Sequence, residues 1–453
     1  MPQWLLRHRW LLVTLVAIFA LAAFAACGDD DDDDDNGETP APTEEPTNGN
    51  GNGDIVQPTL PIKIGQLNSF TGDLSDFGVA HQNAAQLALD EINAAGGVGG
   101  QPVELVTGDT ATDPTQGASE ANRLIEVEGV DFILGALASG VTLPVAESVT
   151  GPNNILQISA ASTSPALTDA NDNDFLFRTV ISDAAQGVVL ADLVESEGIA
   201  SVCTMYINNA YGQGLSEIFA ESFEDLGGSV TAQVPHESEQ ATYASELDSC
   251  TADGPEAVAA LAYPESAGIF LREAVERDAA STYIWVDGTK SDTMFADLGW
   301  PEEFDGTVGT APSALELATG EAFDSAYEAE FGSLPPLPFL RETYDAVYLM
   351  ALAAEKSLTD NIDIREALRA VANPEGTVIN PGTAGFEQAL EAIANGEEIN
   401  YEGAAGPQDF DENGDVLIGA IETWRVDVAN EALVTEAIYR VDLTTGEITQ
   451  VGQ

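Results

Sequence analysis

The stretch Phe132–Gly140, with the sequence FILGALASG, decides how this chain is expected to fold. A short apolar run bounded by small residues is typical of a buried parallel strand. This run passes directly into small and hydroxyl-bearing residues, where a turn or helix begins. The stretch Ile155–Pro165, with the sequence ILQISAASTSP, repeats the pattern. We therefore expect two neighbouring strands that end in hydroxyl groups and free backbone N–H groups.

Ser139 and Thr163 stand at these two strand ends. In an open α/β sheet, ligands bind at the carboxyl ends of the strands. A helix N-terminus beside a serine suits an anion such as a carboxylate. The alternative is that both residues only cap a helix or stabilise a loop. Two such residues in tandem favour a binding site.

Strand-like and helix-like segments alternate from Pro61 onward, and the alternation restarts after Asp183. Repeated strand–helix units predict doubly wound parallel sheets, here two in succession. The final third adds strands and no third α/β unit. Predicted strands lie at 62–67, 103–106, from 131, from 155, 201–207, near 230, 257–262, 283–286, 416–426 and 437–441. Predicted helices lie at 79–94, 114–126, after 139, 185–197, 215–226, 243–249, 266–277 and 338–357.

Residues 1–26 have the features of a secretory signal peptide: a basic start, an apolar stretch and small residues before Cys27. The segment Phe24–Cys27 resembles a bacterial lipobox, although Phe24 replaces the more usual leucine. That resemblance implies cleavage before Cys27 and lipidation of its thiol. A plain signal peptide or an uncleaved anchor helix are the alternatives. Residues 27–60, with seven consecutive aspartates, are expected to form a disordered acidic tether.

The charge of the chain is strongly negative, with 77 acidic against 14 basic residues and a net charge of −63. This balance argues against binding of nucleic acid or anionic membrane surfaces. The lipid on Cys27 would be the contact with the membrane.

Cys203 and Cys250 remain as a pair if Cys27 carries a lipid. Outside the cytoplasm an even pair can form a disulfide. Cys203 lies in a predicted strand, and Cys250 ends a predicted helix just before another strand. A disulfide is therefore expected, and two buried free thiols are the alternative.

The candidate motifs for catalysis, metal binding and cofactor binding in this sequence do not match the known patterns. His81 and His236 have no recognisable nucleophile or metal spacing. The Gly212-x-Gly214 sequence lacks the third glycine of a dinucleotide-binding loop. The stretch 409–415 resembles a calcium loop but lacks its final glutamate, so a turn between strands is expected. We predict no enzyme activity, no metal and no cofactor.

Polar and aromatic residues follow several other predicted strands, and together they describe a cleft between two sheets. One wall carries the hydroxyls for a carboxylate. The other carries an acid for an ammonium group and aromatic rings for an apolar side chain. Each tyrosine could instead be a half-buried core residue, and Asp287 could be a turn residue or a helix cap. The cleft residues are Phe77, Ser139, Thr163, Tyr211, Tyr263 and Asp287.

The order and spacing of several motifs resemble the substrate-binding proteins of ABC transporters, of the leucine/isoleucine/valine-binding type (type I periplasmic binding proteins). The resemblance runs from Pro61 to about Val426. Its motifs are Phe70–Gly72, Phe77–Gly78, Ala88–Gly97, Gly135–Ser139, Ile155–Thr168, Phe177–Arg178, Asp183–Gly187, Asn209–Gly214, Tyr263–Glu265 and Thr343–Ala346.

The resemblance implies roles for individual residues. Ser139 and Thr163 would hold the α-carboxylate of an amino acid, while the Ala161 carbonyl and Asp287 would take the ammonium group. Related amino acid binders often have glutamate where this chain has Asp287, and Gly140 replaces a hydroxyl-bearing residue. Phe77, Tyr211 and Tyr263 would line the pocket, Asp183 would sit at a crossover, and Tyr344 would lie near the hinge.

The resemblance also implies the architecture and the function. Two doubly wound, Rossmann-like lobes would be joined by a multi-strand hinge: 61–182 with 312–415, and 183–311 with 416–453. The lobes would close on a branched-chain or other apolar amino acid, and the lipid-anchored, monomeric protein would deliver it to an ABC permease outside the cytoplasm. Alternatives are a sensor component, or transport of urea, a short amide or an aromatic acid.

Overall fold

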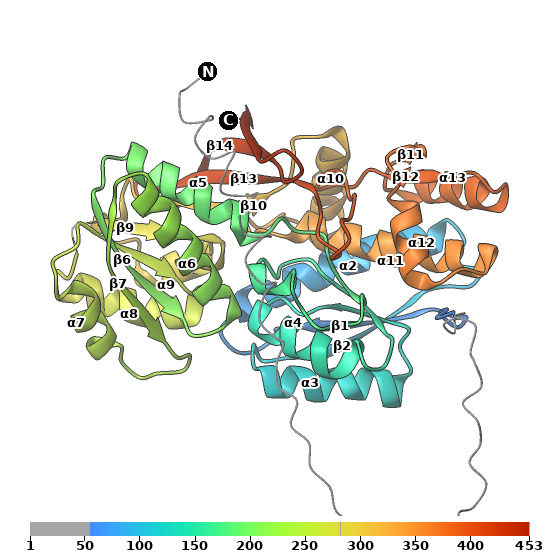
Figure 1. Ribbon diagram of the computed structural model, residues 1–453, viewed down its shortest axis with the longest axis horizontal. Helices are drawn as coiled ribbons and strands as arrows, with labels where there is room; N and C mark the ends of the chain where they lie inside the picture. Colours follow the sequence, from blue (N-terminus) through green and yellow to red (C-terminus); the bar gives the residue numbers. More distant parts are fainter. Residues whose placement is uncertain (1–54, 281, 453) are drawn as a thin grey trace, which may run out of the picture. The chain divides into compact units, whose positions relative to one another are not determined.

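The computed structural model describes residues 55–280 and 282–452, which form two main sheets flanked by helices (Figure 1). The predicted signal peptide, Cys27 and the tether up to residue 54 lie outside the described residues. The prediction of a disordered tether is wrong for residues 55–60, because the Val56 N–H donates to Asp363 Oδ2 at 3.1 Å and Gln57 Nε2 donates to the Ser357 carbonyl at 2.6 Å. Among the residues that are described, no helix is long and apolar enough to cross a membrane.

The first sheet has five parallel strands in the order β2-β1-β3-β4-β5. Their near-continuous apolar sequences are those of strands covered on both faces. Helices α2 and α11 share a core with one face, and α3 and α4 with the other. The strands are β1 (Lys63–Asn68), β2 (Glu104–Asp109), β3 (Phe132–Gly135), β4 (Leu156–Ser159) and β5 (Leu176–Arg178), and the helices are α2 (Ser75–Ala94), α3 (Pro114–Arg123), α4 (Ser139–Val145) and α11 (Leu340–Asp360).

The second sheet has the order β15-β14-β13-β10-β9-β8-β6-β7. Its parallel part, β7 to β10, is wound in the same order as the first sheet, and three antiparallel strands extend it. These strands are β6 (Ser201–Ile207), β7 (Ser229–His236), β8 (Ala257–Leu261), β9 (Thr282–Trp285), β10 (Val308–Ser313), β13 (Ile418–Asp427), β14 (Ala432–Asp442) and β15 (Glu447–Gly452).

Five helices cover the parallel part of the second sheet. Helices α5 and α6 share a core with one face, and α7, α8 and α9 share a core with the other. They are α5 (Asp183–Ser196), α6 (Ala210–Asp225), α7 (Ala244–Thr251), α8 (Pro264–Glu276) and α9 (Asp292–Leu298). The chain passes between the two sheets after β5, after β10 and before β13, which makes three connecting segments.

Most predicted elements of the α/β parts are present in the structure, but the sequence did not predict β5, β10, β15 and α9. Helix α6 begins at Ala210 and not at 215, because Asn209 caps it by accepting hydrogen bonds from the N–H groups of Tyr211 and Gly212. A small region had no predicted elements. It contains α10 (Ala318–Phe331), α12 (Ile364–Val371), α13 (Thr383–Ala394) and a two-stranded ladder of β11 (Thr377–Ile379) and β12 (Ile399–Tyr401).

Cys203 in β6 and Cys250 in α7 form a disulfide bond, with their Cα atoms 5.6 Å apart. Both residues are fully buried in the core that α7 and α8 share with the sheet. The bond therefore ties α7 to a central strand of the second sheet.

The stretch 409–415 forms a turn, as the sequence predicts. Asp411 accepts hydrogen bonds from the N–H groups of Asn413 and Asp415, and Phe410 pairs with Val416. The carboxylate of Asp415 points elsewhere, to Arg178, so it supplies no calcium ligand. Among the residues described, no group of three acidic, histidine or cysteine side chains is placed to hold a metal ion.

Candidate ligand-binding site

A narrow cavity of about 20 Å³ lies where strand ends of the two sheets meet. Ser139 follows β3 and Ala161 follows β4, whereas Tyr211, Tyr263 and Asp287 follow β6, β8 and β9. Both walls are thus built from the carboxyl ends of parallel strands. The cavity is lined by Leu74, Phe77, Leu137, Ser139, Ala161, Tyr211, Tyr263, Asp287, Gly288 and Phe339.

The first-sheet wall offers neutral hydrogen-bond donors. Ser139 is the first residue of α4, and its Oγ accepts a hydrogen bond from the Ser164 N–H at 3.2 Å. Its own hydroxyl proton is therefore free to be donated. The backbone N–H groups of Ser139 and Thr163 donate none of the hydrogen bonds found among the described residues. This set of donors can receive a carboxylate without any cation.

The side chain of Thr163 does not have the predicted role of holding a ligand carboxylate. Its hydroxyl donates a hydrogen bond to Asp183 Oδ2 at 2.8 Å, so the proton points to an acid and away from a ligand carboxylate. Both residues are fully buried. The spacing of Thr163 and Asp183 along the chain could not reveal this pairing, because it arises where β5 leads into α5.

Arg178, at the end of β5, fixes the loop that carries Thr163. Its Nη1 donates to the carbonyl oxygens of Thr163 and Ser164 at 3.0 and 2.8 Å. Its Nη2 binds Asp415 Oδ2 at 2.8 Å, and the guanidinium is almost completely buried. This ion pair joins the binding loop to the third segment that connects the sheets.

The second-sheet wall is aromatic, with one acid at its base. The rings of Tyr211 and Tyr263 stack with their centroids 5.4 Å apart. The Tyr211 hydroxyl donates to Asp287 Oδ1 at 2.9 Å, and Gln186 Nε2 donates to the same oxygen at 2.7 Å. Gly212 has no room for a side chain, since a Cβ there would lie 2.3 Å from the Ile207 carbonyl oxygen. Tight packing, and not a dinucleotide, explains this glycine.

Asp183 and Asp287 are both buried and lie close enough for the charge of one to affect the other, but of the two only Asp287 lines the cavity, and Thr163 does not line it either. Burial, and then the negative charge of Asp287, raise the pKa of Asp183 well above its usual value. Burial raises the pKa of Asp287 to about 6, against the opposing effect of the hydrogen bonds from Gln186 and Tyr211. No ion pair of the described residues includes either acid, and Asp183 Oδ1 has no hydrogen-bond partner in that part of the chain. A cationic group placed between them would be stabilised.

Of the two remaining predicted residues, one lines the cavity and one does not. Phe77, in α2, lines the cavity as expected. Tyr344 does not line it: its hydroxyl donates to Glu91, and its ring packs on Phe323 in the core of the first sheet. Tyr344 is a core residue because α11 presents this face to α2 and α10.

Sequence reasoning missed four lining residues: Leu74, Leu137, Gly288 and Phe339. Phe339 precedes α11 with a left-handed backbone (φ 71°), directly after a proline-rich segment. The proline-rich segment was the only signal in the sequence for Phe339, because the segment ends where helix α11 begins. The two leucines carry no signal beyond hydrophobicity.

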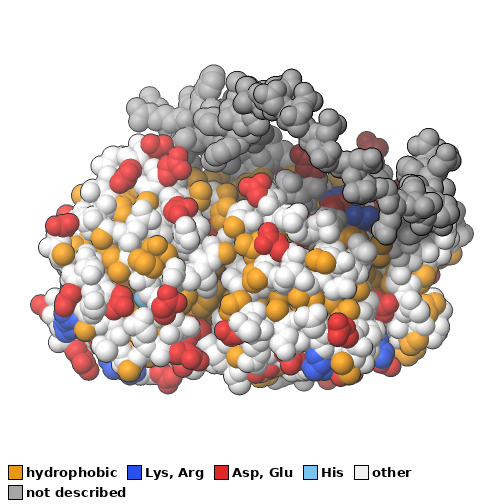
Figure 2. All heavy atoms as spheres, turned by 60° about the horizontal axis from the view of Figure 1, so that its bottom comes forward, with side chains coloured by type: hydrophobic (Ala, Val, Ile, Leu, Met, Phe, Trp, Pro, Cys, Tyr) orange, Lys and Arg blue, Asp and Glu red, His pale blue; other side chains and the backbone are white. Residues whose placement is uncertain are grey.

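A larger cavity of about 520 Å³ adjoins the first, with Tyr263 lining both. Its walls carry the acids Asp73, Asp113, Glu237 and Glu239 and no Lys or Arg. Burial raises the pKa of Asp73 to about 6, with Glu265 adding to the effect. Acidic side chains are also scattered over the face shown in Figure 2, with few basic ones among them. The field around the cavity therefore favours cationic groups.

Comparisons with known proteins agree with this geometry. Residues 61–415 match the family model described as periplasmic binding protein. The chemotactic signal transduction system substrate-binding protein BasB of Halobacterium salinarum is 29% identical over 77% of this chain and 83% of its own. The leucine-, isoleucine-, valine-, threonine- and alanine-binding protein of Pseudomonas aeruginosa is 27% identical over 72% and 86%.

A solved structure shows the same fold. The leucine binding protein LivK from Thermotoga maritima superposes with a TM-score of 0.69 and 25% identity, over 83% of this chain and 98% of its own. The predicted class of fold, two α/β lobes of the type I periplasmic binding protein kind, is thereby confirmed.

Proposed function

Because the chain belongs to the periplasmic binding protein family, we propose that it captures a branched-chain or other apolar amino acid and delivers it to an ABC permease. The chain is a solute-binding protein and not an enzyme, as the sequence predicts. The observation that carries the choice of ligand is the pair of buried acids Asp183 and Asp287, neither of which forms an ion pair among the described residues.

The ligand's ammonium group would lie between the two acids and the Ala161 carbonyl. A buried charge must be paired and hydrogen-bonded, so this pair selects a cation over a neutral group. The Ser139 hydroxyl and the free N–H groups of Ser139 and Thr163 would receive the carboxylate. Every Lys and Arg of the described residues is already engaged in a hydrogen bond or ion pair.

The apolar side chain of the ligand would occupy the space between Leu74, Phe77, Leu137 and Phe339. These four residues are all buried and line the cavity. Tyr263 closes the side that faces the larger cavity.

Capture would proceed by closure of two lobes, 61–182 with 312–415 and 183–311 with 416–453. The ligand contacts residues of both, so it stabilises the closed arrangement more than the open one. Gly140 marks how close the lobes approach, because a Cβ there would lie 2.9 Å from Asn209 Cβ. The missing hydroxyl at this position therefore has a steric reason. Lipidation at Cys27 would hold the monomeric protein near the membrane.

A ligand screen tests the proposal. The protein is unfolded and refolded to remove bound ligand, then heated with leucine, isoleucine, valine, urea, acetamide or benzoate. A ligand at 100 times its Kd adds about 2.7 kcal/mol of stability. We expect stabilisation by the apolar amino acids and none by urea, acetamide or benzoate. Stabilisation by benzoate or an amide alone would contradict the proposed ligand class.

A sensory role is the second candidate, because one relative belongs to a chemotactic signal transduction system. Deleting the gene separates the two roles. Loss of amino acid uptake supports delivery to a permease. Loss of attraction to the same amino acid, with uptake unchanged, supports a sensor.

A further inference from the structure

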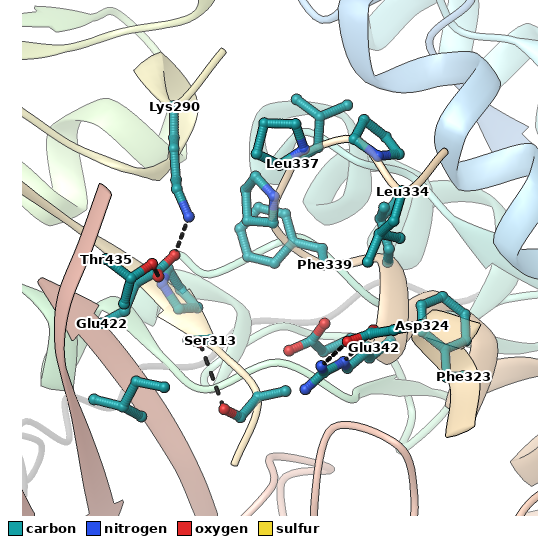
Figure 3. Close-up of a pocket in the computed structure, with 18 of the residues that line it drawn as sticks. Lys290, Ser313, Phe323, Asp324, Leu334, Leu337, Phe339, Glu342, Glu422 and Thr435 are labelled. Carbon is teal, nitrogen blue, oxygen red and sulfur yellow. Dashed lines mark hydrogen bonds and ion pairs between the residues drawn. The ribbon is translucent and has the colours of Figure 1, made fainter. Parts of the chain in front are cut away.

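A third cavity, of about 380 Å³, lies apart from the acid pair, on the side where the chain connects the two sheets. One wall comes from the second sheet and carries Lys290, Glu422 and Thr435 (Figure 3). The opposite wall comes from the connection between α10 and α11 and carries Leu334 and Leu337. Its volume is within the range of about 300–1,000 Å³ that is usual for small-molecule sites.

The charges in this cavity do not balance. Lys290 is paired with Glu422, whose other oxygen accepts a hydrogen bond from Thr435 at 2.6 Å. Arg341 forms two hydrogen bonds to Asp324, at 3.0 and 2.6 Å. Both cations that line the cavity are therefore already neutralised.

Glu316 and Glu342 supply the excess negative charge, and of these two Glu342 is the buried acid. It lines the cavity with only 4% of its surface exposed, and its carboxylate takes part in no ion pair and accepts no side-chain hydrogen bond among the described residues. Burial raises its pKa to about 7, with its own N–H opposing the effect and Asp345 adding to it. Figure 3 shows Glu342 among the lining side chains, between Ser313 and Asp324.

Another wall of this cavity is apolar. Leu334, Leu337 and Phe339 line it together with three prolines of the same segment. A buried acid that forms no ion pair among the described residues, in a cavity with one apolar wall, suits a molecule that combines an ammonium group with a hydrocarbon body.

We propose that this cavity binds a small organic amine with an apolar body, with Glu342 as its counterion. Phe339 lines both this cavity and the one beside Asp287, so the amine contacts the far side of a residue that encloses the ligand. Binding at the two sites is therefore linked, and the linkage is reciprocal. The linkage rests on the proposed function, whereas binding of the amine does not.

Calorimetric titration of the full chain with phenethylammonium tests the proposal, with 2-phenylethanol as the uncharged analogue. We expect saturable binding of the amine, at least tenfold weaker binding of the alcohol, and amine binding that persists in Asp287→Asn. Glu342→Gln should weaken amine binding at least tenfold. Glu321→Gln, an exposed acid on α10 outside the cavity, is the control and should change it less than twofold.

Three results would overturn the amine site: no saturable binding, equal binding to Glu342→Gln, or loss of binding in Asp287→Asn, which would place the amine beside Asp183. The linkage has its own measurement. Saturating amine should change the isoleucine affinity of the parent but not of Glu342→Gln, and an unchanged affinity in the parent would overturn it. Failure of all amino acids to bind would count against the proposed function and leave the amine titration interpretable.

Discussion

Two sets of buried acids in this protein have opposite surroundings. Asp345, in α11, is completely buried and accepts hydrogen bonds from the Tyr401 hydroxyl and the N–H groups of Ala404 and Ala405, each at 2.8 Å. Asp183 and Asp287 are as deeply buried, yet they repel each other, and Asp183 Oδ1 has no partner among the described residues.

This difference in surroundings distinguishes an acid with a structural role from acids with a role in ligand binding. The chain itself provides all that the Asp345 carboxylate requires, so this acid holds the segment 401–405 against α11. The acid pair, in contrast, has no ion-pair partner among the described residues. A buried carboxylate that is left incomplete indicates a ligand, whereas burial alone does not.

The largest expected effect comes from Asp345→Ala. Three buried donors lose their acceptor, which should lower the free energy of unfolding by about 3–6 kcal/mol. Urea denaturation measures the loss, with the exposed Glu391→Ala on α13 as a control that should change stability by less than about 0.5 kcal/mol. Amino acid affinity of the folded variant should not change. Unchanged stability would show that Asp345 is not a structural acid.

Asp287→Asn should have the opposite pattern. Removing the negative charge leaves the bound ammonium without its counterion, which should weaken amino acid binding by about 2–5 kcal/mol, roughly 30-fold to several thousandfold. Stability of the free protein should not fall, because repulsion between the two acids disappears. Calorimetry and thermal unfolding read the two effects, and Asp297→Asn, an exposed acid on α9, is the matched control. Full affinity in Asp287→Asn would remove this residue from the site.

The pH dependence of binding and of stability should differ in sign. The pKa of Asp287 is about 6, raised from 3.8, and a bound ammonium favours its ionised form. Amino acid affinity should therefore rise with pH up to about 6, by up to about tenfold per pH unit. The free protein should show the reverse: a raised carboxyl pKa stabilises the fold at low pH, and this contribution is lost as pH rises from about 4 to about 6.

The two acids can be distinguished in the same experiment. Asp345 also has a pKa near 6, so it contributes to the pH dependence of stability. Asp345→Ala should leave the pH dependence of affinity intact, and Asp287→Asn should reduce it. An affinity that is flat between pH 4.5 and 7 in the parent would contradict a role for an acid with this pKa.

The smallest expected effect is that of Tyr211→Phe. The substitution removes the hydroxyl that donates to Asp287 at 2.9 Å and keeps the ring that stacks on Tyr263. Loss of a hydrogen bond to a carboxylate should weaken amino acid binding by about 1–2 kcal/mol. Tyr206→Phe, a half-buried tyrosine of β6 outside the cavity, is the control. A greater loss than that of Asp287→Asn would show that the hydroxyl contacts the ligand directly.

The sequence predicted most of the α/β architecture because buried parallel strands and amphipathic helices have distinct periodicities. The strands at 62–67 and 257–262 and the helix at 338–357 appear nearly as expected. The region of α12, α13 and the β11–β12 ladder was missed. Its strands have only three residues each, too few for a period to be recognised.

Part of the site was also predictable, since polar residues after strands collect at one edge of a sheet. Ser139, Ala161, Tyr211, Tyr263 and Asp287 all line the cavity. The bond from Thr163 to Asp183 and the burial of Tyr344 depend on which elements pack together, and local sequence does not contain that information. Phe339 lines the cavity because the proline-rich segment turns it inward.

Because every described Lys and Arg forms a hydrogen bond or an ion pair, the folded protein should be a poor substrate for some proteases. Trypsin-like proteases cleave after these residues and need the chain around them to be accessible and extended. Arg178 and Lys290 are buried in ion pairs, and Lys356 on α11 is held by Asp360. The folded part should thus resist such proteases until it opens. Trypsin digestion would then report opening of this protein with little background cleavage.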